Sequence, residues 1–133
     1  GQAIEYFLRQ DYPNRELIIL DDGTDAIGDL VPADPHIRYL RLNKKYLLGA
    51  KRNLACREAA GEIILHWDDD DWMAPYRIRY QVENLLKEQA DICGLDNLFF
   101  FDPSVEKAWR YIYPNGSKPW VLAEPFAIKI LLE

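Results

Sequence analysis

Four consecutive aspartates, residues 68–71, stand directly after an apolar run at residues 62–67 and directly before Trp72. Adjacent carboxylates repel one another unless a cation, a hydrogen-bond network or open water absorbs their charge. A divalent metal ion is therefore the first hypothesis for these residues. The alternative is a solvated acidic turn or the start of a helix, where carboxylates are favoured.

A second acidic cluster, formed by Asp21, Asp22 and Asp25, follows the apolar run at residues 16–20. Alone it is typical of a strand-ending turn, in which Gly23 permits a sharp change of direction. Parallel sheets bind ligands outside the carboxyl ends of their strands. We therefore expect the two acidic clusters to lie at one rim of a sheet, which favours a binding site over two unrelated turns.

Two basic residues, Lys51 and Arg52, fall near the start of a helix predicted over residues 48–60. Arg52 is two residues from Leu54, about 200° around a helix axis, so we expect it to face away from the core. Lys51 is open to two interpretations, a ligand contact or a plain surface charge. A divalent ion held by one or two carboxylates takes further ligands from phosphates, so the pattern outlines a diphosphate site.

The elements that must position these residues alternate along the first part of the chain. This alternation predicts an α/β fold with a mostly parallel sheet flanked by helices, and the later strands are expected at an antiparallel edge. The predicted helices cover residues 2–10, 48–60 and 75–89, and the predicted strands cover residues 16–20, 37–42, 62–67, 92–101 and 108–113.

Composition narrows the class of protein. The 133 residues are enough for one domain with a core. A net charge of −6 argues against a nucleic-acid partner, which usually requires a basic face. Cys56 and Cys93 have no metal-ligand or disulfide spacing, so we expect small buried hydrophobes in a reducing compartment. We therefore expect a cytoplasmic protein, or a longer protein working at the cytoplasmic face of a membrane.

An ordered set of motifs carries a resemblance to a known family. The motifs are residues 10–14, residues 16–25, residues 49–53, and residues 60–63 leading into residues 68–72. In order and spacing, over roughly residues 1–90, they resemble family 2 glycosyltransferases, which have the nucleotide-sugar-binding GT-A fold. The resemblance implies an inverting enzyme that moves a sugar from a nucleotide-diphosphate sugar, expected to be a UDP-sugar, to a hydroxyl of a saccharide or another acceptor.

The same resemblance implies roles for individual residues. Asp22 would receive the nucleotide base, with Asp21 shaping the pocket and Arg52 lying near the nucleotide. Residues 68–70 match the family's Asp-x-Asp motif, in which Asp68 faces the ribose and Asp70 coordinates the Mn²⁺ or Mg²⁺ that bridges the diphosphate. The predicted donor-site residues are Asp21, Asp22, Arg52, Asp68 and Asp69, and the predicted metal ligands are Asp70 and Asp68.

Two features of the family have no clear counterpart in the sequence. Nothing corresponds to the family's apolar first strand, and after residue 119 only Glu124 and Glu133 could supply a general base. We therefore expect a single truncated domain, with residues 1–90 as the donor half and residues 91–133 as the start of the acceptor side. The general base is not identified.

Two other functions remain alternatives. One is a catalytically inactive fragment or interaction module, because an open position in the sheet should recruit a strand, for example from a second copy in a homo-oligomer. The other is a nucleotidyltransferase, which should carry a glycine-rich basic phosphate loop near the start; the sequence shows no such loop.

Overall fold

The computed structural model describes residues 1–95, 97–112 and 124–126. The chain forms two compact units, residues 1–91 and residues 92–133, and each is considered by itself. The division falls beside the predicted boundary between the donor half and the acceptor side. The organisation of the whole chain as one domain stays a prediction.

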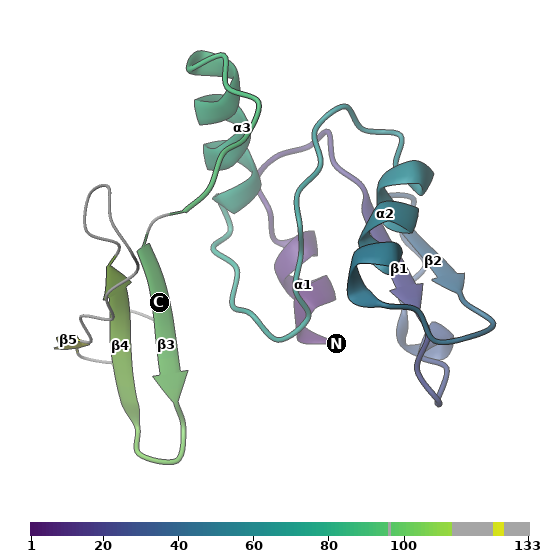
Figure 1. The fold of residues 1–133 in the computed structure, drawn as a ribbon, viewed down its shortest axis with the longest axis horizontal. Helices are drawn as coiled ribbons and strands as arrows, with labels where there is room; N and C mark the ends of the chain where they lie inside the picture. The colour runs from purple at the N-terminus through teal and green to yellow at the C-terminus, as the bar shows by residue number, and fades with distance from the viewer. Residues whose placement is uncertain (96, 113–123, 127–133) are drawn as a thin grey trace. The chain divides into compact units, whose positions relative to one another are not determined.

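The first unit confirms the α/β fold class. Its strands β1 and β2 are parallel neighbours, with Leu17 opposite Ile37 and Asp21 opposite Arg41, and α2 contacts β1 (Figure 1). In chain order its elements are α1 (Gln2–Leu8), β1 (Leu17–Asp21), the 3-10 turn η1 (Gly28–Leu30), β2 (Ile37–Arg41), α2 (Leu48–Glu58) and α3 (Arg77–Lys87).

The third predicted strand, residues 62–67, pairs with no strand among the described residues, so that prediction is wrong. The segment is nevertheless alternately buried. Ile63, Leu65 and Trp67 pack against the core, whereas Ile64 and His66 are exposed. Side chains can therefore alternate between the core and solvent here without a ladder, which needs a neighbouring strand to hydrogen-bond.

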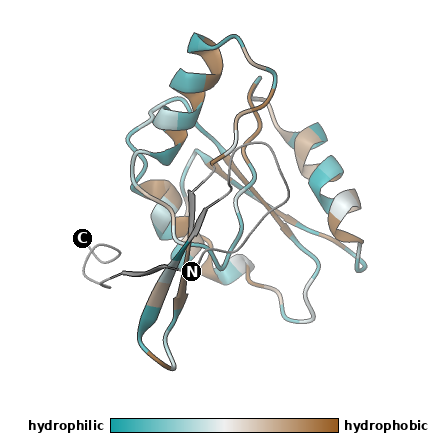
Figure 2. Ribbon diagram, turned by 60° about the vertical axis from the view of Figure 1, so that its left-hand side comes forward, coloured by the Kyte–Doolittle hydropathy of each residue, from teal (hydrophilic) through white to brown (hydrophobic). Residues whose placement is uncertain are grey.

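The core of the first unit joins its two ends. Phe7 of α1 is 2% exposed and packs with Ile78 and Val82, which are one turn apart on the amphipathic helix α3 (Figure 2). The edge of the Phe7 ring also meets the Trp67 ring, with centroids 6.4 Å apart. Through Trp67, this core therefore holds the segment that leads into the four aspartates.

Helix α2 forms where it is predicted but buries none of its residues. Leu47 and Ala50 are exposed, and Leu54 is half-buried. The expectation of a buried cysteine is wrong for Cys56, because it lies on this exposed helix, while Cys93 is half-buried. Helix α2 is thus largely a surface element, and its side chains are available to a ligand.

The second unit is an antiparallel sheet within its described part. Its strands are β3 (Asn97–Asp102), β4 (Lys107–Ile112) and β5 (Glu124–Phe126), in the order β3-β4-β5. The later strands are antiparallel, as predicted, but in the described part of the chain they form a separate sheet rather than an edge of the β1-β2 sheet. Residue 113 of the predicted strand at residues 108–113 lies outside the described residues. Among the described helices, none is long and apolar enough to cross a membrane.

Candidate functional site

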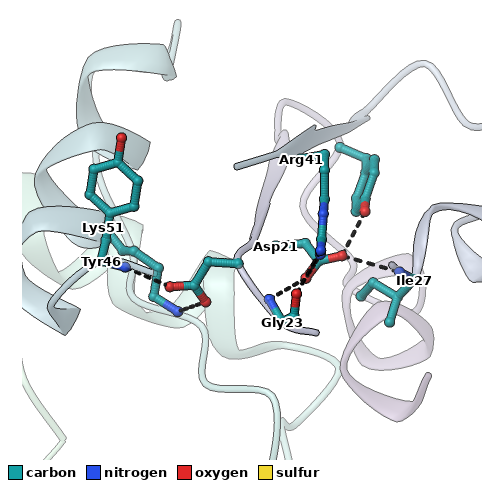
Figure 3. Close-up of polar contacts among 8 residues, drawn as sticks. Asp21, Gly23, Ile27, Arg41, Tyr46 and Lys51 are labelled. Carbon is teal, nitrogen blue, oxygen red and sulfur yellow. Dashed lines mark hydrogen bonds and ion pairs between the residues drawn. The ribbon is translucent and has the colours of Figure 1, made fainter. Parts of the chain in front are cut away.

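The two acidic clusters meet at helix α2. Lys51 Nζ donates a hydrogen bond to Asp22 Oδ1 at 2.8 Å (Figure 3), and Arg52 Nη2 donates to Asp68 Oδ1 at 3.1 Å. Since the Cα atoms of consecutive residues are about 3.8 Å apart, both clusters lie within reach of one point on the helix. The structure thus pairs Arg52 with Asp68 and pairs Asp22 with Lys51, the residue next to Arg52 in the chain.

Asp21 is buried and fully engaged inside the protein. Its carboxylate accepts hydrogen bonds from the Tyr39 hydroxyl at 2.6 Å, the Gly23 amide at 2.9 Å and the Ile27 amide at 3.1 Å. It also pairs with Arg41 at 2.8 Å (Figure 3). The Tyr39 hydrogen bond, followed by the two amides, holds the pKa of Asp21 far below its ordinary value. Asp21 therefore closes the turn after β1 rather than presenting a free carboxylate.

This network predicts a pH-dependent stability. The pKa of Asp21 is lowered in the folded protein. The ionised Asp21 carboxylate therefore adds fully to the free energy of unfolding above its ordinary pKa of about 4, and this stabilisation is lost as the pH falls below that value. We expect Asp21→Asn to be less stable than wild type near neutral pH and to lose less further stability in acid. Urea unfolding followed by tryptophan fluorescence, between about pH 7 and about pH 3, measures the stability near neutral pH and its loss in acid.

The control for this prediction is Asp25→Asn, since Asp25 is exposed in the same turn. It should follow the wild-type pH profile. Parallel profiles for wild type and Asp21→Asn would contradict the assignment of the acid sensitivity to Asp21.

Asp22 is held by two different donors. Its Oδ1 accepts from Lys51, and its Oδ2 accepts from the Tyr46 amide at 2.9 Å (Figure 3). The Lys51 hydrogen bond, followed by the Tyr46 amide, lowers the pKa of Asp22. The side chains of Asp22 and Lys51 are only 12% and 27% exposed. Lys51 is therefore the partner of Asp22, and the interpretation as a plain surface charge is wrong.

A hollow of about 210 Å³ opens beside Asp22. Its volume is below the roughly 300 Å³ at which small-molecule pockets usually begin, so it can receive one part of a nucleotide sugar. The lining residues are Asp22, Gly23, Thr24, Arg41, Leu42, Asn43, Lys44 and Lys45.

Sequence reasoning missed the basic side of this hollow. The available signal was the pair Lys44 and Lys45, which stands just beyond a strand's carboxyl end in an otherwise acidic protein. Lys44 also lies over the Tyr46 ring, with its Nζ 5.3 Å from the ring centroid. The hollow therefore combines the Asp22 carboxylate with nearby positive charge.

The four aspartates form an exposed loop, here called the acidic loop (residues 68–71). Asp68 is paired with Arg52, whereas no hydrogen bond or ion pair joins Asp69 or Asp70 to any residue that the structure describes. Trp72 is 50% exposed beside the loop. The carboxylate of Asp70 is therefore available to a ligand.

The donor set of the acidic loop suits a hard divalent ion that is completed from outside the protein. Within residues 1–95, 97–112 and 124–126, no three His, Cys, Asp or Glu side chains are grouped closely enough to hold a metal by themselves. Mg²⁺-type ions need only one or two carboxylates, with water and substrate phosphates filling the other positions. Asp70, together with the second oxygen of Asp68, fits that requirement.

Arg77 lies half-buried behind the acidic loop. Its Nη2 donates to the His66 carbonyl at 3.2 Å, its Nη1 donates to Met73 Sδ, and its guanidinium lies 5.2 Å from the Trp67 ring centroid. Burial lowers the pKa of Arg77, while the negative charges of nearby aspartates oppose that shift. Arg77 thus connects the residue before the acidic loop to a residue just after it.

The general base stays unassigned. Only the backbone of Glu124 is described, within β5, and Glu133 lies outside the described residues. The described part of the chain therefore supplies a candidate donor site rather than a complete active centre.

An α/β unit that gathers two acidic segments around a basic helix face agrees with the GT-A fold that the sequence resemblance implies. The comparison with protein families agrees with this class. The chain belongs to glycosyl transferase family 2, whose profile matches residues 1–130.

Several curated proteins are similar to this chain. Glycosyltransferase GlyG of Streptococcus pneumoniae serotype 4 is 28% identical over 84% of the chain and 38% of its own length. The putative colanic acid biosynthesis glycosyl transferase WcaA of Escherichia coli K12 is 40% identical over 58% of the chain and 29% of its own length. A third, WfaP of Escherichia coli, is named as a UDP-Glc:alpha-D-GlcNAc-diphosphoundecaprenol beta-1,3-glucosyltransferase, and is 33% identical over 65% of the chain.

The chain spans well under half the length of these relatives, 38%, 29% and 36% of them respectively. No solved structure gives a significant match.

Proposed function

We propose that the first unit binds the nucleotide-sugar donor of a metal-dependent, inverting glycosyltransferase. The observation that carries this proposal is the pair of contacts made by consecutive residues of α2, Lys51 to Asp22 and Arg52 to Asp68. They place the candidate base pocket and the candidate metal ligand around one short basic stretch.

The proposed roles are those that the family resemblance implies for these residues. The Asp22 carboxylate and its hollow receive the base of a UDP-sugar, and the Arg52 guanidinium lies near the nucleotide. Asp68 faces the ribose, Asp69 lies at the donor and shapes the loop between them, and Asp70 ligates Mn²⁺ or Mg²⁺. When bound, the ion supplies positive charge that stabilises the departing nucleoside diphosphate.

The local charges explain how an acidic protein can hold an anionic donor. Although the net charge is −6, Lys44 and Lys45 line the hollow and Lys51 stands beside it. The pairing with Asp22 fixes the Lys51 ammonium at this place before a ligand arrives, so less side-chain ordering is required on binding. Arg52 is 40% exposed, and its pairing with an exposed carboxylate is weak enough to exchange for a phosphate.

In an inverting transfer, the acceptor hydroxyl attacks the anomeric carbon from the side opposite the leaving nucleoside diphosphate, while a general base takes the hydroxyl proton. The chain's described residues hold the donor in this reaction. A UDP-sugar is the proposed donor, and the printed name of WfaP, which includes UDP-Glc, supports UDP as the first probe. The acceptor is a saccharide or another hydroxyl compound. The cytoplasmic location stays a prediction.

Calorimetric titration of UDP in the presence and absence of Mn²⁺ tests this proposal. We expect binding heat with Mn²⁺, a weaker response with Mg²⁺, and little heat when a chelator removes the metal. Absence of any nucleotide heat in the presence of either metal would overturn the proposal.

A second candidate is an interaction module that pairs with another strand. The favouring observation is the extended segment at residues 62–67, which pairs with no strand in the described part of the chain. An unpaired extended segment can template an added strand, for example from a second copy. Light scattering after size exclusion should then show a homo-oligomer, whereas a strictly monomeric protein would rule this candidate out.

A further inference from the structure

The acidic loop is attached at both ends to the N-terminal segment of the chain. At its entry, Trp67 Nε1 donates a hydrogen bond to the Ala3 carbonyl at 3.1 Å. Beyond its exit, Gln10 Nε2 donates to the Ala74 carbonyl at 2.7 Å, and Gln10 Oε1 accepts from the Ile78 amide at 3.1 Å. Contacts between residues 64 or more positions apart therefore set the distance that the loop must span.

Gln10 is buried and is held in place by several hydrogen bonds. It is 5% exposed, and its Nε2 also donates to the Tyr6 carbonyl at 3.0 Å. Next to it, the Asp11 amide donates to the Pro75 carbonyl at 2.9 Å. Helix α3 has no side-chain cap from its own N-cap residue, so the Gln10 oxygen satisfies one of its free first-turn amides.

We propose that helix α1 and Gln10 form a platform that positions the acidic loop for its ion, with Gln10 as the positioning residue at the exit and Trp67 at the entry. This inference rests on the proposed function. The physical reason is that four adjacent carboxylates repel one another and spread unless the chain on both sides is fixed. A constant distance between the two ends of the loop keeps Asp70 in one place relative to Arg52 and the Asp22 hollow.

A substitution of Gln10 can change the position of the acidic loop without changing its charge. Gln10 is neutral, so its replacement leaves the net charge around the ion unchanged. Arg77 also bridges the loop ends, but removing its positive charge would alter the attraction for a cation at the same time. An effect of Gln10 on metal-dependent binding therefore reports position alone.

The test is Gln10→Met, which keeps the length of the side chain and removes its donor and acceptor. Loss of groups that orient metal ligands typically weakens binding by 10- to 100-fold, so we expect Mn²⁺-dependent UDP binding about 10-fold weaker than wild type. Amide hydrogen exchange at Ile78 should also become faster. Trp67→Phe keeps an aromatic ring but removes the hydrogen bond to Ala3 and part of the ring packing on Phe7 and Arg77, so it should weaken binding in the same direction, by a smaller factor.

The control is Val82→Ala. Val82 is 4% exposed in the core on α3, against which Trp67 also packs, but its side chain makes none of the hydrogen bonds that attach the loop. It should lower stability while leaving the UDP affinity unchanged at temperatures where the protein is folded. Equal weakening by Val82→Ala and Gln10→Met would reduce Gln10 to a general stabilising residue and overturn the inference.

The remaining outcomes are also distinct. If Gln10→Met does not fold, Trp67→Phe decides: weaker metal-dependent binding supports the platform, and wild-type binding overturns it. Wild-type affinity in both variants overturns the inference while leaving the proposed function intact. A wild-type protein that binds no UDP with Mn²⁺ removes the proposed function itself, and the inference with it.

Discussion

Asp70→Ala is expected to abolish the Mn²⁺-dependent binding of UDP, with a loss of roughly 100-fold or more, because it removes a direct ligand rather than a group that orients one. Asp70 is exposed and unpaired within the described residues, so its carboxylate is free for an ion and its removal breaks no internal contact. Calorimetry with UDP and Mn²⁺ measures the loss, and unfolding curves should match those of wild type.

The control for Asp70→Ala is Asp71→Ala, which removes the same charge from the adjacent position of the loop. Exposed charges act weakly through solvent, so a change of only a few-fold is expected from charge alone. Equal losses in the two variants would show that the loop acts only through its total charge and would contradict a specific ligand role for Asp70.

Phe7→Ala is expected to destabilise the first unit by about 3–5 kcal/mol, the usual cost of deleting a buried aromatic ring. The ring is 2% exposed and contacts Ile78, Val82 and Trp67. Because domains are stable by only about 5–15 kcal/mol, this loss approaches the whole stability. Urea unfolding followed by circular dichroism gives the value.

The control for Phe7→Ala is its neighbour Leu8→Ala. Leu8 is on the same helix but 39% exposed, so its truncation should cost about 1 kcal/mol or less. Similar costs for the two variants would contradict the assignment of Phe7 to the core that holds α1, α3 and the segment before the acidic loop together.

The spacing of apolar residues and the order of the predicted elements were enough to predict the fold class and the direction of Arg52. Alternation of apolar runs and helical patterns predicts the α/β class. The expected meeting of Asp22 and Asp68 at the carboxyl ends of two parallel strands is different, because residues 62–67 form no strand in the described part of the chain. The 200° offset from Leu54 predicts that Arg52 faces outward, and its side chain contacts Asp68.

The different environments of Asp21 and Asp22 could not be predicted from the sequence. The two residues are adjacent and chemically identical, and only the register of β1 and β2, with Asp21 opposite Arg41, decides which one is enclosed. The Tyr39 hydroxyl then completes the network around Asp21. Such a distinction depends on contacts between strands that local pattern does not specify.

The contacts of Gln10 could not be predicted from the sequence for a related reason. Its partners Ala74 and Ile78 are more than 60 positions away in the chain, so no spacing rule connects them. The third predicted strand failed for a similar reason, because the local pattern of residues 62–67 could not show whether a partner strand lies beside them.

On the proposed function, the Asp22 hollow and the acidic loop bind one nucleoside diphosphate through one divalent ion. Nuclear magnetic resonance of the 15.6 kDa protein with UDP tests it most directly, using Mg²⁺ for shift changes and a trace of paramagnetic Mn²⁺ for broadening. We expect the amides of residues 68–71 to broaden most, and those of residues 22–24 and 43–45 to shift in the same titration with the same affinity. Broadening of the acidic loop with no response at the hollow, or no response at either place, would contradict the claim.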